Sequence, residues 1–101
     1  MDDLDFFYDS FLDYLKIEKN LASNTVESYA RDIFSLIQFL YDSEIYDVKD
    51  ITPLHISRWQ RLYSKKGQQI STQARALSAA KQWFEYLLDN RYIDSDPTGN
   101  I

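Results

Sequence analysis

The composition of the 101-residue chain favours packed helices and excludes several classes of protein. Hydrophobic residues make up 45% and aromatic residues 16% of the sequence, whereas glycine and proline occur twice each, a balance typical of a helical domain. The chain has no cysteine, so disulfides and thiolate metal sites are excluded. Every apolar segment is interrupted well before the roughly 18 residues of a membrane span, and residues 1–5 have neither the basic start nor the apolar run expected of a signal peptide. We therefore expect one all-α domain that is cytoplasmic and not bound to a membrane.

The net charge of −5 is distributed unevenly. Residues 1–50 carry 12 acidic and 4 basic side chains, a net of −8, whereas residues 51–101 carry 4 acidic and 7 basic ones, a net of +3. This asymmetry indicates two surfaces with different partners, although random scatter over a solvated surface is the alternative.

The first half of the chain predicts two helices. Residues 4–18 follow a run of aspartates and place six apolar or aromatic residues at helical spacing, namely Leu4, Phe7, Tyr8, Phe11, Tyr14 and Leu15. The second helix begins at Ser23 or Asn24 and extends to about Asp42. Asn24 and Glu27 have the spacing of a capping box. The apolar side of this helix is expected to comprise Val26, Tyr29, Ala30, Ile33, Ile37 and Leu40.

The second half predicts two more helices and a tail. Thr52 can cap a helix that starts at Pro53 and ends near Ser64, and residues 65–70 form a basic polar loop. Ser71 is expected to cap the last helix, which reaches about Asn90. The apolar side of that helix is expected to comprise Ala74, Leu77, Ala80, Phe84 and Leu88. We expect a compact bundle of four principal helices over residues 1–93, followed by a linker or frayed end at 94–101.

Two of the expected helices carry the same polar pattern opposite their apolar side. At about 100° per residue, four side chains of each helix fall in one narrow sector, at the spacing i, i+4, i+7 and i+11. These are Asn24, Ser28, Arg31 and Ser35, and Ser71, Arg75, Ser78 and Gln82. Short hydroxyl and amide groups allow a partner to approach closely, and arginine offers a planar fork for phosphate or a guanine edge. The pattern favours duplex DNA, with solvated faces and helix caps as the alternative.

Further basic side chains are available to contact phosphates. They are Arg58, Arg61, Lys65, Lys66 and Lys81. The first three share one side of the helix that begins at Pro53, and Lys66 lies in the basic loop.

At these residues the sequence resembles the amino-terminal core-binding domain of tyrosine recombinases and phage integrases, a SAM-like domain, and particularly the Xer type. The segment LASNTVESYARDI (residues 21–33) resembles the second helix of that domain. The segments ITPLHISRW (51–59) and ISTQARALSAAKQWFEYLLDN (70–90) resemble its third and fourth helical segments, in the same order. Lys81 and Trp83 stand where the family often has arginine and phenylalanine, and Asp96 precedes Pro97 where asparagine is common.

The resemblance implies a four-helix domain that clamps one side of duplex DNA, opposite a separate catalytic domain. The positions that match the family's DNA-facing residues are Asn24, Thr25, Ser28, Arg31, Ser71, Thr72, Arg75, Ser78 and Lys81. Other recombinase subunits are implied as partners in a synaptic complex, and the isolated domain is expected to be a monomer. Strand cleavage and rejoining belong to the family's catalytic domain, so we expect no catalytic residue, cofactor or metal site in this chain.

Other chemically active residues favour structural roles. His55 lies in the first turn of its helix without local partners for catalysis. Tyr14, Tyr29, Tyr63 and Tyr86 fit aromatic packing rather than nucleophilic attack. The aspartates of the first helix are spaced by four residues and favour a solvated face, with contact to a basic protein surface or a divalent ion as the other interpretations. These are Asp5, Asp9 and Asp13, and an interaction module that uses this row without binding DNA is the alternative function.

Overall fold

The computed structural model describes residues 3–99, which form four α-helices and one short 3₁₀ helix and contain no strand. The elements are α1 (Leu4–Ile17), α2 (Ser23–Asp42), η1 (Val48–Asp50), α3 (Pro53–Lys65) and α4 (Ile70–Asp89). The prediction of an all-α four-helix bundle is confirmed, and the predicted ends lie within about two residues of the observed ones. None of the helices in the described region is long and apolar enough to cross a membrane.

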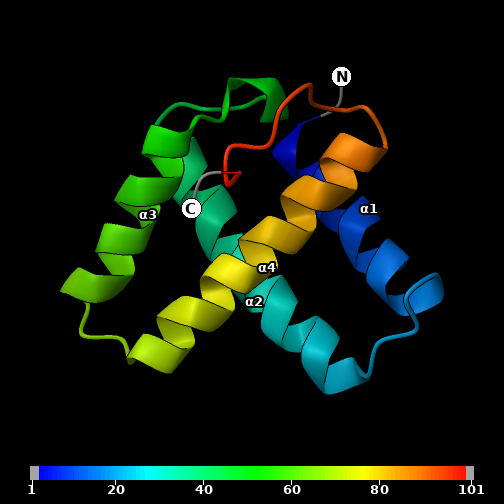
Figure 1. The fold of residues 1–101 in the computed structure, drawn as a ribbon, viewed down its shortest axis with the longest axis horizontal. Coiled ribbons are helices and arrows are strands. Elements are labelled where there is room, and N and C mark those ends of the chain that lie inside the picture. The colour runs from blue at the N-terminus through cyan, green and yellow to red at the C-terminus, as the bar shows by residue number, and fades with distance from the viewer. Residues whose placement is uncertain (1–2, 100–101) are drawn as a thin grey trace.

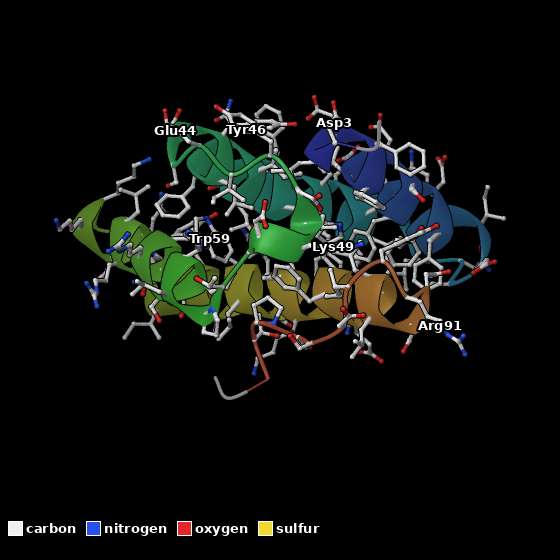
Figure 2. The ribbon with its side chains drawn as sticks, turned by 90° about the horizontal axis from the view of Figure 1, so that it is seen from above. Asp3, Glu44, Tyr46, Lys49, Trp59 and Arg91 are labelled. Atoms are coloured by element: carbon white, nitrogen blue, oxygen red, sulfur yellow. The ribbon has the colours of Figure 1, made fainter. Side chains whose placement is uncertain are left out.

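The helices form two layers that enclose one core. Helices α1 and α2 lie in one layer and α3 and α4 in the other, and α4 crosses over α2 (Figures 1 and 2). Trp59 points from α3 into the space between the layers (Figure 2), where its side chain is buried. Trp83, Phe84 and Phe11 are buried beside the aliphatic residues of the same core. Burial of these large side chains provides the main stabilisation of the fold.

Two of the α-helices begin at side-chain caps. The Asp3 carboxylate accepts a hydrogen bond of 3.0 Å from the Phe6 N–H at the start of α1. At α3, the Thr52 hydroxyl accepts a hydrogen bond from the His55 N–H, and His55 Nδ1 accepts one of 3.0 Å from the Thr52 N–H. The predicted cap at Thr52 is therefore confirmed, and His55 has the structural role expected of it.

The caps predicted for α2 and α4 were wrong. The cap residues are Ala22 and Gln69, and neither makes a side-chain cap hydrogen bond. Ser23, Asn24 and Ser71 lie inside the first helical turns instead and are exposed. Both helices therefore begin one position or more earlier than a serine or asparagine cap would place them. Their short polar side chains remain on the surface.

The apolar side of α2 is close to the predicted one, but that of α4 is rotated. In α4 the buried residues are Ala76, Ala79, Ala80, Trp83, Phe84, Tyr86 and Leu87. Ala74 and Leu88 were predicted to be buried and are exposed, and Leu77 is half-buried. Helix α4 contacts all three other helices, so it buries a wide arc rather than the single narrow stripe assumed from the sequence.

The turn between α3 and α4 is closed by Gly67. Its φ angle of +73° lies in the left-handed region, which glycine adopts without steric cost. The Gly67 N–H donates to the Ser64 carbonyl, and the next N–H, that of Gln68, donates to the Tyr63 carbonyl, the arrangement of a Schellman motif. The turn brings the start of α4 back beside the end of α3.

The described part of the tail, residues 94–99, is folded onto the domain. Pro97 and Thr98 are buried, and the Asp96 carboxylate accepts hydrogen bonds from the Thr98 N–H and hydroxyl at 2.7 and 2.6 Å. The tail lies on the side of α3 and α4 (Figure 2), so this stretch is not a frayed end. That 94–101 links to a catalytic domain stays a prediction, and residues 1–2 and 100–101 of the predicted domains lie outside the described region.

Candidate nucleic-acid interface

A pocket of about 420 Å³ lies where α2, α3 and α4 meet. Its residues come from the middle of α2, the end of α3, the following turn and the first half of α4. They are Arg31, Asp32, Ser35, Leu62, Tyr63, Lys66, Gln68, Thr72 and Arg75. In Figure 1 the end of α3 and the start of α4 lie together at the lower left, and α2 passes behind α4 in the middle of the molecule. Segments distant in sequence thus contribute to one surface.

The pocket brings together four of the residues that the sequence predicted to bind DNA. Arg31, Lys66, Thr72 and Arg75 line it. The other predicted residues lie outside it, and all are exposed except the half-buried Ser28. They are Asn24, Thr25, Ser28, Ser71, Ser78, Lys81, Arg58, Arg61 and Lys65. The structure therefore divides the predicted set into a concave centre and a surrounding surface.

Arg75 is held by a carboxylate that the sequence interpretation did not include. Arg75 Nε donates to Asp32 Oδ2 at 2.9 Å, and Arg75 Nη2 donates to Asp32 Oδ1 at 3.0 Å. The Asp32 side chain is only 2% exposed, whereas that of Arg75 is 39% exposed. The hydrogen bonds to Asp32 raise the pKa of Arg75. This pair joins α2 to α4 and fixes one arginine at the pocket.

The sequence held a weak signal for Asp32. At about 100° per residue, Asp32 falls between the polar sector and the apolar side of α2, a position at which a carboxylate needs a partner. Its partner lies 43 positions away in the chain, so the pair could not be assigned from local spacing.

A second polar contact supports the pocket from α3. Ser35, the last member of the polar set on α2, accepts a hydrogen bond of 3.3 Å from the indole N–H of Trp59. Tyr63 lines the same pocket, and burial raises the pKa of Tyr63, so this phenol stays protonated at neutral pH. Ser35 is thus engaged inside the protein rather than presented to a partner.

The charges around the pocket suit an anion. Three cationic side chains, Arg31, Lys66 and Arg75, surround one carboxylate, that of Asp32, which is already paired. Hydroxyl and amide groups of Thr72 and Gln68 complete the polar wall. Cationic forks and short hydrogen-bonding groups are the usual protein contacts to a DNA backbone.

The outer side of α1 has the opposite character. Asp5, Asp9 and Asp13 are all exposed, and within the described residues no group of three or more His, Asp or Glu side chains is arranged to hold a metal ion. Phe6 and Phe34 are also largely exposed, at 47% and 48%. None of these three aspartates lines the pocket between α2, α3 and α4.

Comparison with known proteins places these features in a family. Residues 8–91 match the family described as phage integrase, N-terminal SAM-like domain. The chain is 33% identical over 92 residues to the tyrosine recombinase XerD of Halalkalibacterium halodurans, covering 90% of this chain and 31% of that protein. It is 35% identical over 89 residues to XerD of Pasteurella multocida, covering 87% and 29%. With XerC of Natranaerobius thermophilus the identity is 34% over 87 residues, covering 85% and 29%.

The chain belongs to the family of phage integrase N-terminal SAM-like domains. Its relatives are tyrosine recombinases of the Xer type, so it is a recombinase domain. The chain spans about a third of the length of the curated relatives that it matches. The resemblance stated from the sequence is thereby confirmed.

Proposed function

We propose that this domain binds duplex DNA in site-specific recombination or integration, clamping it between the exposed polar faces of α2 and α4. The observation that carries the proposal is the cationic pocket at the meeting point of three helices. Arg31, Lys66 and Arg75 gather there although the chain as a whole has a net charge of −5. A local cluster of positive charge on an otherwise acidic protein provides a surface that attracts a polyanion such as DNA.

The surrounding residues extend this surface along the two helices. The predicted contacts on α2 and α4 are Asn24, Thr25, Ser28, Ser71, Thr72, Ser78 and Lys81. The short side chains at the starts of these helices leave backbone N–H groups accessible, and the positive end of each helix dipole favours phosphate. Arg58, Arg61 and Lys65 on α3 are proposed to supply outer phosphate contacts.

The proposal assigns recognition and positioning to this domain, and no catalytic residue. DNA strand cleavage and rejoining would be carried out by a catalytic domain of a full-length tyrosine recombinase. A cytoplasmic location is part of the same proposal, because the chain is similar to tyrosine recombinases of the Xer type. The exposed acidic and aromatic side of α1 is proposed to face other recombinase subunits rather than DNA.

Salt dependence of binding tests the proposal. Affinity for a fluorescent duplex of mixed sequence would be measured by anisotropy at increasing salt. If the domain neutralises about five phosphates, its affinity falls roughly 10²- to 10³-fold between about 50 and 200 mM salt. A complex that is insensitive to salt, or no binding at the lowest salt, would contradict the proposal.

The second candidate function is a helical protein-interaction module that does not bind DNA. It is favoured by the aspartate row on α1 and by Phe6 of α1 and Phe34 of α2, whose side chains are about half exposed. In that case neutralising Arg31 would leave the function intact, whereas changing Phe34 to Ser would abolish partner binding.

A further inference from the structure

We infer that Asp32 is a positioning residue of the proposed DNA interface, which holds the Arg75 guanidinium in one orientation at the pocket. The inference rests on the proposed function and deepens it, because it assigns a role to a residue outside the predicted contact set. A carboxylate beside a phosphate site opposes binding through its charge. If Asp32 assists DNA binding, its favourable effect on the affinity must exceed this repulsion.

The geometry of the pair provides that gain. Both Asp32 oxygens accept hydrogen bonds from one edge of the guanidinium, formed by Nε and Nη2. A guanidinium has five N–H donors in a fixed plane, so three remain outside this pair. Because Asp32 is 2% exposed and Arg75 39% exposed, the carboxylate is the buried anchor and the guanidinium is the group that reaches the surface.

Orientation before binding strengthens a contact made by a long side chain. An unrestrained arginine loses rotamer freedom when it binds a phosphate or a base edge. Arg75 has already lost much of that freedom in its pair with Asp32, which also fixes the plane in which its remaining donors lie. Arg31, which lines the same pocket but is exposed, serves as the internal comparison.

The variant Asp32→Asn separates positioning from charge, because the two effects have opposite signs. Removal of the negative charge alone would strengthen binding to DNA, whereas loss of the bidentate pair weakens it. We expect the affinity of D32N for the duplex to fall roughly tenfold, the size of one lost charge-assisted hydrogen bond. Glu27→Gln is the matched control, since Glu27 is exposed on the same helix and its neutralisation changes the net charge equally. E27Q is expected to bind as tightly as the unaltered chain or slightly more tightly.

A double variant shows whether Asp32 acts through Arg75. In the Arg75→Ala background there is no guanidinium to hold, so adding D32N is expected to leave the Kd unchanged or to lower it. If D32N weakens binding equally in both backgrounds, or if D32N alone binds as tightly as the unaltered chain, the inference is overturned. Thermal unfolding of each variant is recorded first, because Asp32 is buried.

An NMR measurement on the unaltered chain tests the inference without a substitution, and decides it if D32N does not fold. The Nε–H signal of Arg75 is expected to be visible before DNA is added and to keep its position as duplex is titrated in. Movement to the position of an unpaired arginine would overturn the inference, because Arg75 would then leave Asp32 to bind. If the unaltered chain does not bind duplex at low salt, the proposed function and this inference both fail. Normal binding by both the unaltered chain and D32N defeats the inference alone.

Discussion

Helices α2 and α4 carry the same spacing of polar residues, yet the structure places their two arginines differently. Arg31 of α2 is exposed at the pocket, whereas Arg75 of α4 is half-buried and bound on one edge by Asp32. Ser35, the last member of the α2 set, is also engaged inside the protein, since it accepts a hydrogen bond from Trp59. Identical spacing therefore indicates which face is polar, but not which side chain is rigid.

The largest effect is expected from Arg75→Ala. Asp32 would be left buried without its partner, which we expect to lower the free energy of unfolding by about 2 kcal/mol, less than for a fully buried pair because Arg75 is partly exposed. Duplex binding should weaken by about 1 to 3 kcal/mol if Arg75 meets a base edge, and less if it meets only phosphate. Denaturant unfolding and anisotropy measure the two quantities separately. Unchanged DNA binding by a folded variant would remove Arg75 from the interface.

Ser35→Ala tests whether the end of the α2 set is structural. The indole N–H of the buried Trp59 would lose its acceptor, so the free energy of unfolding should fall by about 1.5 kcal/mol. Its control is Ser28→Ala, which changes the same residue type on the same polar face and should stay within about 0.5 kcal/mol. Equal stability of the two variants in thermal unfolding would show that the Trp59 contact is unimportant.

Gly67→Ala tests the turn that places Lys66 and Gln68 at the pocket. Apart from the adjoining residues, no heavy atom lies within 4 Å of the position that an added Cβ would occupy, so the cost comes from the φ angle. We expect a loss of about 1 kcal/mol in the free energy of unfolding. Gly67→Asn should lose less, because asparagine tolerates this conformation better. A stability of G67A equal to that of the unaltered chain would contradict this account of the turn.

The smallest change in stability is expected from Arg31→Ala, the counterpart of Arg75→Ala. Because Arg31 is exposed, the free energy of unfolding should change by no more than about 0.5 kcal/mol. In a plot of the logarithm of duplex affinity against the logarithm of salt concentration, the slope should become shallower by about one. If R31A lowered the free energy of unfolding as much as R75A, Arg31 and Arg75 would not differ in their structural roles.

Local signals in the sequence predicted the helices well and their contacts less well. The order Thr52, Pro53, His55 identified the start of α3 because a cap depends only on neighbouring residues. Ser71 and Asn24 were misassigned as caps because residues that favour caps also occur in exposed first turns. Their exposure there leaves them available to a partner.

The parts that sequence reasoning missed depend on contacts between distant residues. The buried arc of α4 is wide because three helices pack against it, so Ala76 and Leu87 are buried outside the stripe expected from one contact face. Asp32 was not predicted because a charged residue is normally assigned to solvent. Only the crossing of α2 and α4 brings it to Arg75. The predicted contact residues themselves remain to be tested.

The most direct test of the clamp is a titration of the ¹⁵N-labelled chain with a duplex of mixed sequence at low salt. We predict that amide signals from residues 24–35 and 71–82 shift together, and that the shifts fade as salt is added. Signals from the outer side of α1, including Asp5 and Asp9, should stay in place. Shifts confined to α1, or no shifts at high DNA concentration, would contradict the proposal that α2 and α4 bind DNA.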